Sequence, residues 1–120
     1  MCIYVVDLEA MASFYSAVLA GSIRSDEDGV CSIVEETAAI VLVTMRPEVA
    51  AQPDAPSVAL VRTEVAIKAC LHVGDLDAAT AAVRDHGGAV RGPEWSWHGS
   101  RRIDVVDPEG NVVQLVASGA

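Results

Sequence analysis

Three side chains that can do chemistry lie two residues apart in the second half of the chain: Lys68, Cys70 and His72. On a β-strand this spacing places all three on one face. An imidazole titrates near neutral pH and can move protons, whereas an ammonium group or a thiol can bind a polar ligand. His72 is therefore the best candidate for a catalytic residue. The alternative is structural, with His72 neutral and partly buried and Lys68 extending its ammonium group into solvent from a strand end.

Two further charged residues, Arg102 and Asp104, alternate with the apolar residues Ile103 and Val105. We expect the apolar pair to pack on a helix, which turns the charged pair to the opposite face of the strand. There the two charges can orient a ligand, because binding sites place a few polar groups in apolar surroundings. Alternatively, they form a structural ion pair with each other.

Both tryptophans lie in one segment, residues 93–100, with the sequence Pro-Glu-Trp-Ser-Trp-His-Gly-Ser. The composition of this segment is typical of a loop. Tryptophan offers a large apolar area and one hydrogen-bond donor, and it stacks on planar or cationic groups. Trp95 and Trp97 are therefore candidate ligand contacts, unless they close the end of a sheet or lie in a dimer contact.

These residues belong to two copies of one pattern, because the segment at 4–10 is repeated at 72–78. In each copy an apolar run ends at an aspartate that precedes a helical pattern. Asp7 and Asp75 suit helix N-caps, since a short carboxylate accepts hydrogen bonds from the first free amides of a helix.

Apolar residues spaced by three and four predict two helices. The first runs from 8 to 19 and is ended by Gly21, and the second runs from 76 to 86 and leaves through Gly87 and Gly88.

Short β-like runs follow each helix, which gives the order β-α-β-β-β twice and an α+β class. Turns are expected at 26–29 and at 107–110. Three prolines mark a linker at about 47–63 between a first module at about 1–46 and a second at about 64–120, together one domain. The strands are expected at residues 22–25, 30–35, 39–45, 89–91, 101–106 and 112–117.

Composition excludes several classes of function. The chain has 120 residues, and its 17 acidic and 8 basic residues give a net charge of −9, which repels the phosphate backbone of nucleic acids and attracts cations. No apolar run approaches the roughly 20 residues needed to cross a bilayer. No signal peptide is visible, so we expect a cytoplasmic protein without a membrane partner.

Other familiar chemistry is missing from the sequence. It has no phosphate-binding loop or nucleophile elbow, and no two histidines have the i, i+4 spacing of a helical metal site. Its three cysteines form no CxxC pair, and their odd number argues against a disulfide framework. We expect Cys31 to be a buried, reduced thiol.

A resemblance to a known family rests on the two Asp-Leu-acid-Ala helix starts, on Phe14-Tyr15 with Leu19 and Gly21, and on the closing Asp-Pro-Glu-Gly-Asn-Val-Val-Gln-Leu at 107–115. Together these residues resemble the vicinal oxygen chelate superfamily of glyoxalases, bleomycin-resistance proteins and extradiol dioxygenases. The resemblance covers nearly the whole chain. It implies two β-α-β-β-β modules whose curved mixed sheets surround a cavity, often completed by dimerisation.

Enzymes of this superfamily usually hold one divalent metal with four His, Gln or Glu side chains from the first and last strands of each module. Carried over by position, the first ligand falls before Met1, the second is Lys68, the third lies near Val41 and the fourth is Gln114. An ammonium group has no lone pair, a lone amide oxygen is a weak ligand, and hydrocarbon is none. The resemblance therefore points to a metal-free branch, and we expect no cofactor.

The same resemblance implies that the polar faces of the strands line the cavity. Tyr4 corresponds to His72 in the repeat, so it is expected to line the cavity as well. It also places the tryptophan segment beside the groove of antibiotic-binding members. The expected ligand-binding residues are Tyr4, Lys68, Cys70, His72, Trp95, Trp97, Arg102, Asp104 and Gln114.

Three functions stay open. We favour a metal-independent small-molecule binding protein similar to bleomycin-resistance and antibiotic-sequestering proteins, with a cationic or planar ligand stacked on a tryptophan. The second is a glyoxalase- or dioxygenase-like enzyme (a lyase, isomerase or oxygenase) with a degenerate metal site, or a cofactor-free isomerase that uses His72 as its base. The third is an accessory module with a vestigial cavity. A homodimer is expected, because paired modules expose β-edges.

Overall fold

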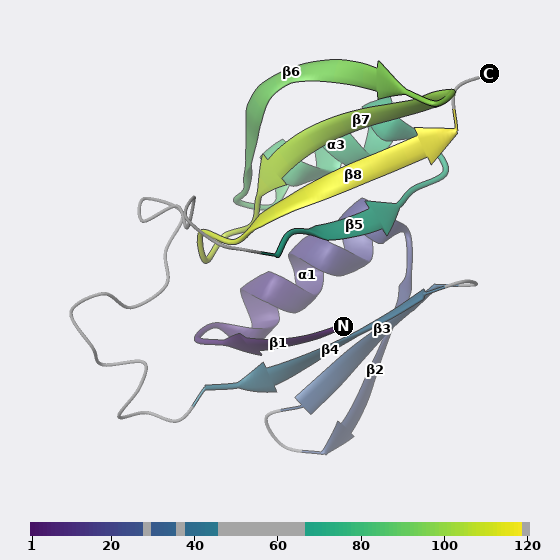
Figure 1. Ribbon diagram of the computed structural model, residues 1–120. Helices are drawn as coiled ribbons and strands as arrows, with labels where there is room; N and C mark the ends of the chain where they lie inside the picture. The colour runs from purple at the N-terminus through teal and green to yellow at the C-terminus, as the bar shows by residue number, and fades with distance from the viewer. Residues whose placement is uncertain (28–29, 36–37, 46–66, 119–120) are drawn as a thin grey trace.

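The computed structural model describes residues 1–27, 30–35, 38–45 and 67–118 and consists of two β-α-β-β-β modules in sequence (Figure 1). The α+β class and the repeated order of elements are thus as the sequence predicts. The predicted linker at 47–63 lies outside the described residues.

Each module contains one helix and four strands. The first module is made of β1 (Cys2–Val5), α1 (Leu8–Leu19), β2 (Ser22–Glu27), β3 (Val30–Glu35) and β4 (Ala38–Thr44). The second is made of β5 (Ala69–His72), α3 (Leu76–Asp85), β6 (Ala89–Trp97), β7 (Ser100–Val106) and β8 (Val112–Ser118).

The two sheets have the same topology. Their strand orders are β1-β4-β3-β2 and β5-β8-β7-β6, and in each the first strand of the module pairs parallel with the last while the other neighbours are antiparallel. The sequence repeat therefore corresponds to a duplicated mixed sheet.

Both helices begin at the predicted aspartates. Asp7 accepts a 3.0 Å hydrogen bond from the backbone amide of Ala10, and Asp75 accepts the equivalent bond in α3. The end of α1 differs from the prediction, because Ala20 rather than Gly21 adopts the left-handed conformation, with φ of 53°. The Cβ atom of alanine makes this conformation less favourable than it would be for glycine. The amide of Gly21 closes the helix by donating to the carbonyl of Ser16.

The glycine pair after α3 has two separate roles. Gly87 takes the left-handed exit, with φ of 84°, as predicted. Gly88 instead permits close packing, because a Cβ atom there would lie 2.5 Å from Cε2 of Phe14 and 2.5 Å from the carbonyl oxygen of Val106.

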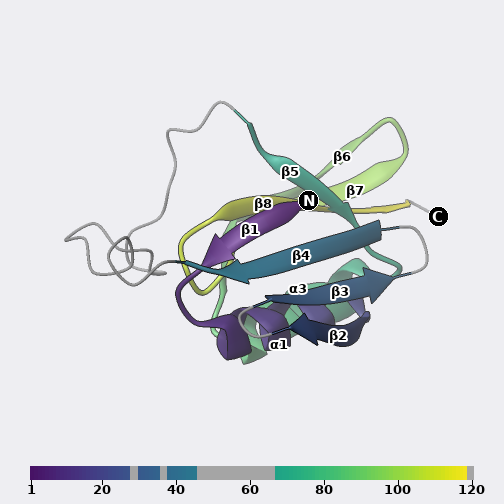
Figure 2. The same cartoon turned by 90° about the horizontal axis from the view of Figure 1, so that it is seen from below.

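The core joins the two modules. Helix α1 packs on the first sheet, α3 packs on the second, and the helices pack against each other (Figure 1 and Figure 2). Cys31 is a buried free thiol, as predicted, and burial raises its pKa. No helix among the described residues is long and apolar enough to cross a membrane. The largest fully buried hydrophobic side chains are Tyr15, Phe14, Met11, Ile33, Ile40, Leu42, Leu76 and Leu115.

The segment that contains both tryptophans is not the loop predicted from the sequence, because most of it belongs to strand β6. Strand β6 continues to Trp97 instead of ending at Arg91, and it pairs with β7 across a two-residue turn at His98 and Gly99. Both turn residues have positive φ, 48° and 77°, which is the backbone of a type I′ hairpin. Pro93 is tolerated because it lies in the irregular stretch between Arg91 and Trp95, where the pairing register shifts.

The first sheet also departs from the predicted bounds. Strand β2 extends to Glu27, so it includes the first two residues of the turn expected at 26–29. Residues 28–29 are outside the described part of the chain.

Candidate functional site

Most of the predicted site residues meet on one face of the second sheet. Ile103 and Val105 are buried on the helix side, as predicted, so Arg102 and Asp104 lie on the opposite side. Cross-strand pairing puts further side chains on that side in two rows. One row is Cys70, Gln114, Asp104 and Arg91, and the next is His72, Val116, Arg102 and Trp95. We call this surface, together with Lys68, Ser100 and Trp97, the outer face of the second sheet.

A chain of hydrogen bonds crosses the outer face. Nζ of Lys68 lies 2.7 Å from Oδ2 of Asp104, and Nε2 of Gln114 donates to Oδ1 of the same carboxylate at 3.3 Å. Nη1 of Arg102 donates to Oε1 of Gln114 at 2.7 Å, and its Nε donates to Oγ of Ser100 at 2.9 Å. The sequence-based alternative of an Arg102–Asp104 ion pair is therefore wrong, because Asp104 pairs with Lys68.

The two tryptophans flank this network. Cζ of Arg102 lies 4.9 Å from the ring centroid of Trp97, a cation–π distance, and the ring of His98 meets Trp97 edge-on at 4.3 Å. Trp95 is the direct cross-strand neighbour of Arg102. Both indoles stay accessible, with 57% of Trp97 and 40% of Trp95 exposed.

Three of the predicted ligand-binding residues have few or no contacts with this hydrogen-bond network. Cys70 is exposed, and its Sγ lies 3.8 Å from Oε1 of Gln114. His72 is exposed, so the alternative of a partly buried histidine is wrong. Its imidazole makes no hydrogen bond or ion pair with a described residue, although its backbone lies in the β5–β8 ladder. Tyr4 lies on the first sheet and is 64% exposed.

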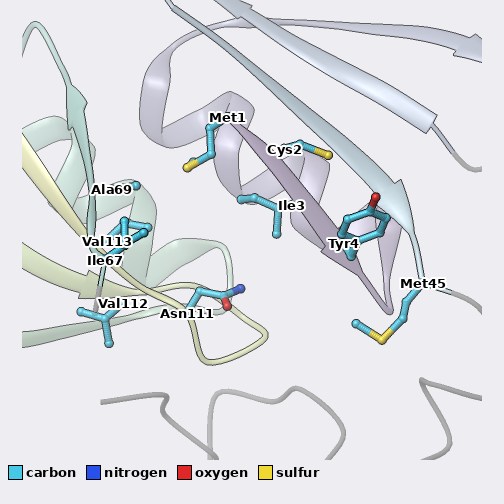
Figure 3. A pocket seen from close by; sticks show the side chains of 10 residues that line it. All are labelled: Met1, Cys2, Ile3, Tyr4, Met45, Ile67, Ala69, Asn111, Val112 and Val113. Atoms are coloured by element: carbon cyan, nitrogen blue, oxygen red, sulfur yellow. The ribbon is translucent and has the colours of Figure 1, made fainter. Parts of the chain in front are cut away.

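A groove of about 440 Å³ separates the edge strand β1 from the pair β5–β8 (Figure 3). In the close-up, side chains of the first module face those of the second across this groove. Tyr4 is among them, so it borders an apolar groove rather than the polar network. The lining residues are Met1, Cys2, Ile3, Tyr4, Met45, Ile67, Ala69, Asn111, Val112 and Val113.

Sequence reasoning missed the role of the turn between β7 and β8. Asp107 is fully buried, and its carboxylate accepts hydrogen bonds from the hydroxyl of Tyr15, from Nδ2 of Asn111 and from two backbone amides of the turn. Burial, and secondly the charge of Asp107, raises the pKa of Tyr15 well above its ordinary value. The Asp-Pro-Glu-Gly-Asn motif was the available signal, but a motif does not reveal a partner 92 residues away.

Glu109 in the same turn holds the other module directly. It is 4% exposed, and its carboxylate accepts hydrogen bonds of 2.8–2.9 Å from the amides of Val6 and Asp7 at the start of α1. Burial raises its pKa, and the bonds from Asp7 and Val6 act in the opposite direction. Both buried carboxylates are structural, because their hydrogen bonds hold the two modules together.

A family model described as "Glyoxalase-like domain" matches residues 1–116. The chain belongs to this family. It is thereby a member of the vicinal oxygen chelate superfamily, as the sequence motifs indicate.

Solved structures share the fold over nearly the whole chain. TnmS3, an antibiotic binding protein from Streptomyces sp. CB03234, is 25% identical, with a TM-score of 0.65 and coverage of 99% of this chain and 93% of that one. A glyoxalase/bleomycin resistance protein from Albidiferax ferrireducens T118 is 18% identical, with a TM-score of 0.71 and coverage of 97% and 93%.

The fosfomycin resistance protein FosX from Mesorhizobium loti is 15% identical, with a TM-score of 0.67 and coverage of 98% and 88%. The likeness to FosX and to the Albidiferax protein shows the fold alone. Comparison with curated proteins gave no match.

The residues at the family's metal positions do not fit a divalent cation. Lys68 presents an ammonium group already paired with Asp104, and the amide oxygen of Gln114 already accepts from Arg102. Val41, paired with Cys2, offers hydrocarbon. Within the described ranges, no three His, Cys, Asp or Glu side chains gather as a metal site requires.

Proposed function

We propose that this glyoxalase-like protein binds a small organic molecule on the outer face of the second sheet without using a metal ion. The observation that carries the proposal is the pairing of Lys68 with Asp104 and of Gln114 with Arg102 at the family's metal positions. A cation there would have to displace an ammonium group at 2.7 Å from the nearest carboxylate. The same network leaves oriented polar groups beside exposed indoles, which suits recognition of an organic ligand.

The similarity to TnmS3 supports a binding function. That protein is described as an antibiotic binding protein, and its 25% identity extends over 99% of this chain. We therefore propose an antibiotic-like ligand that has a planar part stacked on Trp95 or Trp97.

The structure gives less support to a catalytic base. A general base works best when a neighbouring group fixes its orientation and tautomer. The exposed imidazole of His72 has no hydrogen-bond partner among the described residues. Binding is therefore preferred to proton transfer as the function of this face.

A homodimer fits this proposal. In one chain Trp95 and Trp97 on the outer face are exposed, and so is Tyr4 on the other sheet. A second copy that covers the outer face with its first sheet would bring the partner's tyrosine to the ligand and exclude water from it. Native mass spectrometry with and without ligand tests this assembly, and a monomer in both states would contradict it.

Two measurements test the proposed function. Tryptophan fluorescence is followed while a panel of planar antibiotics is titrated into the protein, and elemental analysis is made of protein purified without chelator. We expect saturable quenching by at least one compound and no stoichiometric metal. The absence of any response at sub-millimolar ligand, or one nickel, zinc, iron or manganese ion per chain, would overturn the proposal.

A further inference from the structure

The outer face of the second sheet is positively charged although the chain carries a net charge of −9. Among the described residues, three basic side chains lie on it: Lys68, Arg91 and Arg102. Among the described residues of this face, Asp104 is the carboxylate that accompanies them, and it is committed to Lys68 at 2.7 Å. The local charge therefore has the opposite sign to the charge of the whole molecule.

Arg102 is a half-buried guanidinium without a counter-charge in the described structure. Its two hydrogen bonds go to neutral oxygens, Oε1 of Gln114 and Oγ of Ser100, and these bonds fix its plane. Its Nη2 donates no hydrogen bond to a described residue. A fixed guanidinium with free donors matches the two oxygens of a carboxylate.

The neighbouring arginine shows the contrast. Arg101 points to the other face of the same strand, where it pairs with Glu94 at 2.8 Å and with Asp77 at 3.0 Å. Within the described part of the chain, two carboxylates thus neutralise Arg101, whereas no carboxylate pairs with the adjacent Arg102. This difference points to an external anion for Arg102.

Aromatic surface lies next to the same guanidinium. Trp97 lies 4.9 Å from it, and Trp95 is its cross-strand neighbour. We propose that the site takes a planar aromatic carboxylate, whose carboxylate pairs with Arg102 and whose ring packs on Trp95 or Trp97. This inference rests on the proposed binding function, and it replaces the cationic ligand suggested by net charge, because the charge nearest the ligand dominates its binding.

Three matched probes test the sign of the charge: 2-naphthoate, 2-naphthamide and 2-naphthylmethylammonium. They share one ring system and are anionic, neutral and cationic. The readout is the NMR shift of the indole N–H signals, of which the chain has two, both from this site. We expect 2-naphthoate to bind about tenfold or more tighter than the amide, and the cation to bind weakest.

The outcomes separate the two proposals. Equal or tighter binding of the amide or the cation would overturn the anionic ligand and leave small-molecule binding intact. Unchanged indole signals with all three probes would count against binding on the outer face itself.

Variants of Arg102 test whether the carboxylate of the ligand pairs with this residue. Arg102→Gln should weaken 2-naphthoate binding by about tenfold and abolish the preference over the amide, and Arg102→Lys should retain part of it. Arg24→Gln, at an exposed arginine of the first sheet, is the control and should leave binding unchanged. An Arg102→Gln protein that folds and keeps the full preference would overturn the proposal.

Discussion

The hydroxyl of Tyr15 donates a 2.7 Å hydrogen bond to Oδ2 of Asp107, and both side chains are fully buried. This bond joins α1 of the first module to the turn between β7 and β8 of the second. The carboxylate of Glu109, two residues further on, accepts hydrogen bonds from the backbone amides of Val6 and Asp7 in the first module. One turn therefore fixes the position of the second sheet, and of its outer face, relative to the first module.

Tyr15→Phe should lower the free energy of unfolding by about 1–2 kcal/mol, because a buried carboxylate oxygen loses a donor while the ring keeps its packing. Urea denaturation measures the change. Tyr4→Phe removes the hydroxyl of the other tyrosine, which is exposed, and should have no effect. Equal stability of the two variants would show that the bond between the modules contributes nothing.

The same bond makes stability depend on alkaline pH. The folded-state pKa of Tyr15 is raised well above 10.0 by burial and by the charge of Asp107. Its contribution is thus complete below the unfolded pKa and is lost as pH rises above it, since the unfolded chain releases the proton first. The free energy of unfolding should fall from about pH 9 to 11 in the native chain and change less in Tyr15→Phe. Parallel pH profiles would contradict this.

Gly88→Ala should destabilise the protein by about 1–3 kcal/mol, because the new methyl group would lie 2.5 Å from Phe14 and from a backbone oxygen. Gly74→Ala is a matched control, since a Cβ atom there meets nothing within 4 Å. Thermal unfolding compares the two. A loss of similar size at both positions would mean that close packing is not the reason for glycine at 88.

Asp104→Asn should raise the affinity for 2-naphthoate several-fold, because it removes the negative charge of the outer face and frees Lys68. Stability should change by less than about 1 kcal/mol, since the pair is partly exposed, 40% for Lys68 and 17% for Asp104. Calorimetric titration measures the affinity. Asp77→Asn removes a carboxylate paired with Arg101 on the other side of the sheet and should leave affinity unchanged. Weaker binding by Asp104→Asn would indicate that Asp104 itself contacts the ligand.

Features set by local spacing were predictable from the sequence. The bounds of α1 and the N-caps Asp7 and Asp75 follow from helical periodicity and from the chemistry of free amides. Strand alternation predicted the face of Arg102 and Asp104, and the family resemblance placed Lys68 on the same face.

Features set by pairing between distant segments were not predictable. Gly92 and Pro93 suggest a break, yet pairing with β7 carries β6 through an irregular register to Trp97. Lys68, the ion-pair partner of Asp104, is 36 residues away in the sequence. The alternation of side chains along the strand therefore predicted the face on which Asp104 lies but not its ion pair.

Metal-independent binding on the outer face is tested most directly by one NMR titration made twice. Protein dialysed against EDTA is titrated with 2-naphthoate while the indole signals of Trp95 and Trp97 are followed, and the titration is repeated after a divalent metal is added. We expect both signals to shift with the same dissociation constant in the two experiments. Binding that appears only after the metal is added, or that leaves both indole signals unmoved, would contradict metal-independent binding on the outer face.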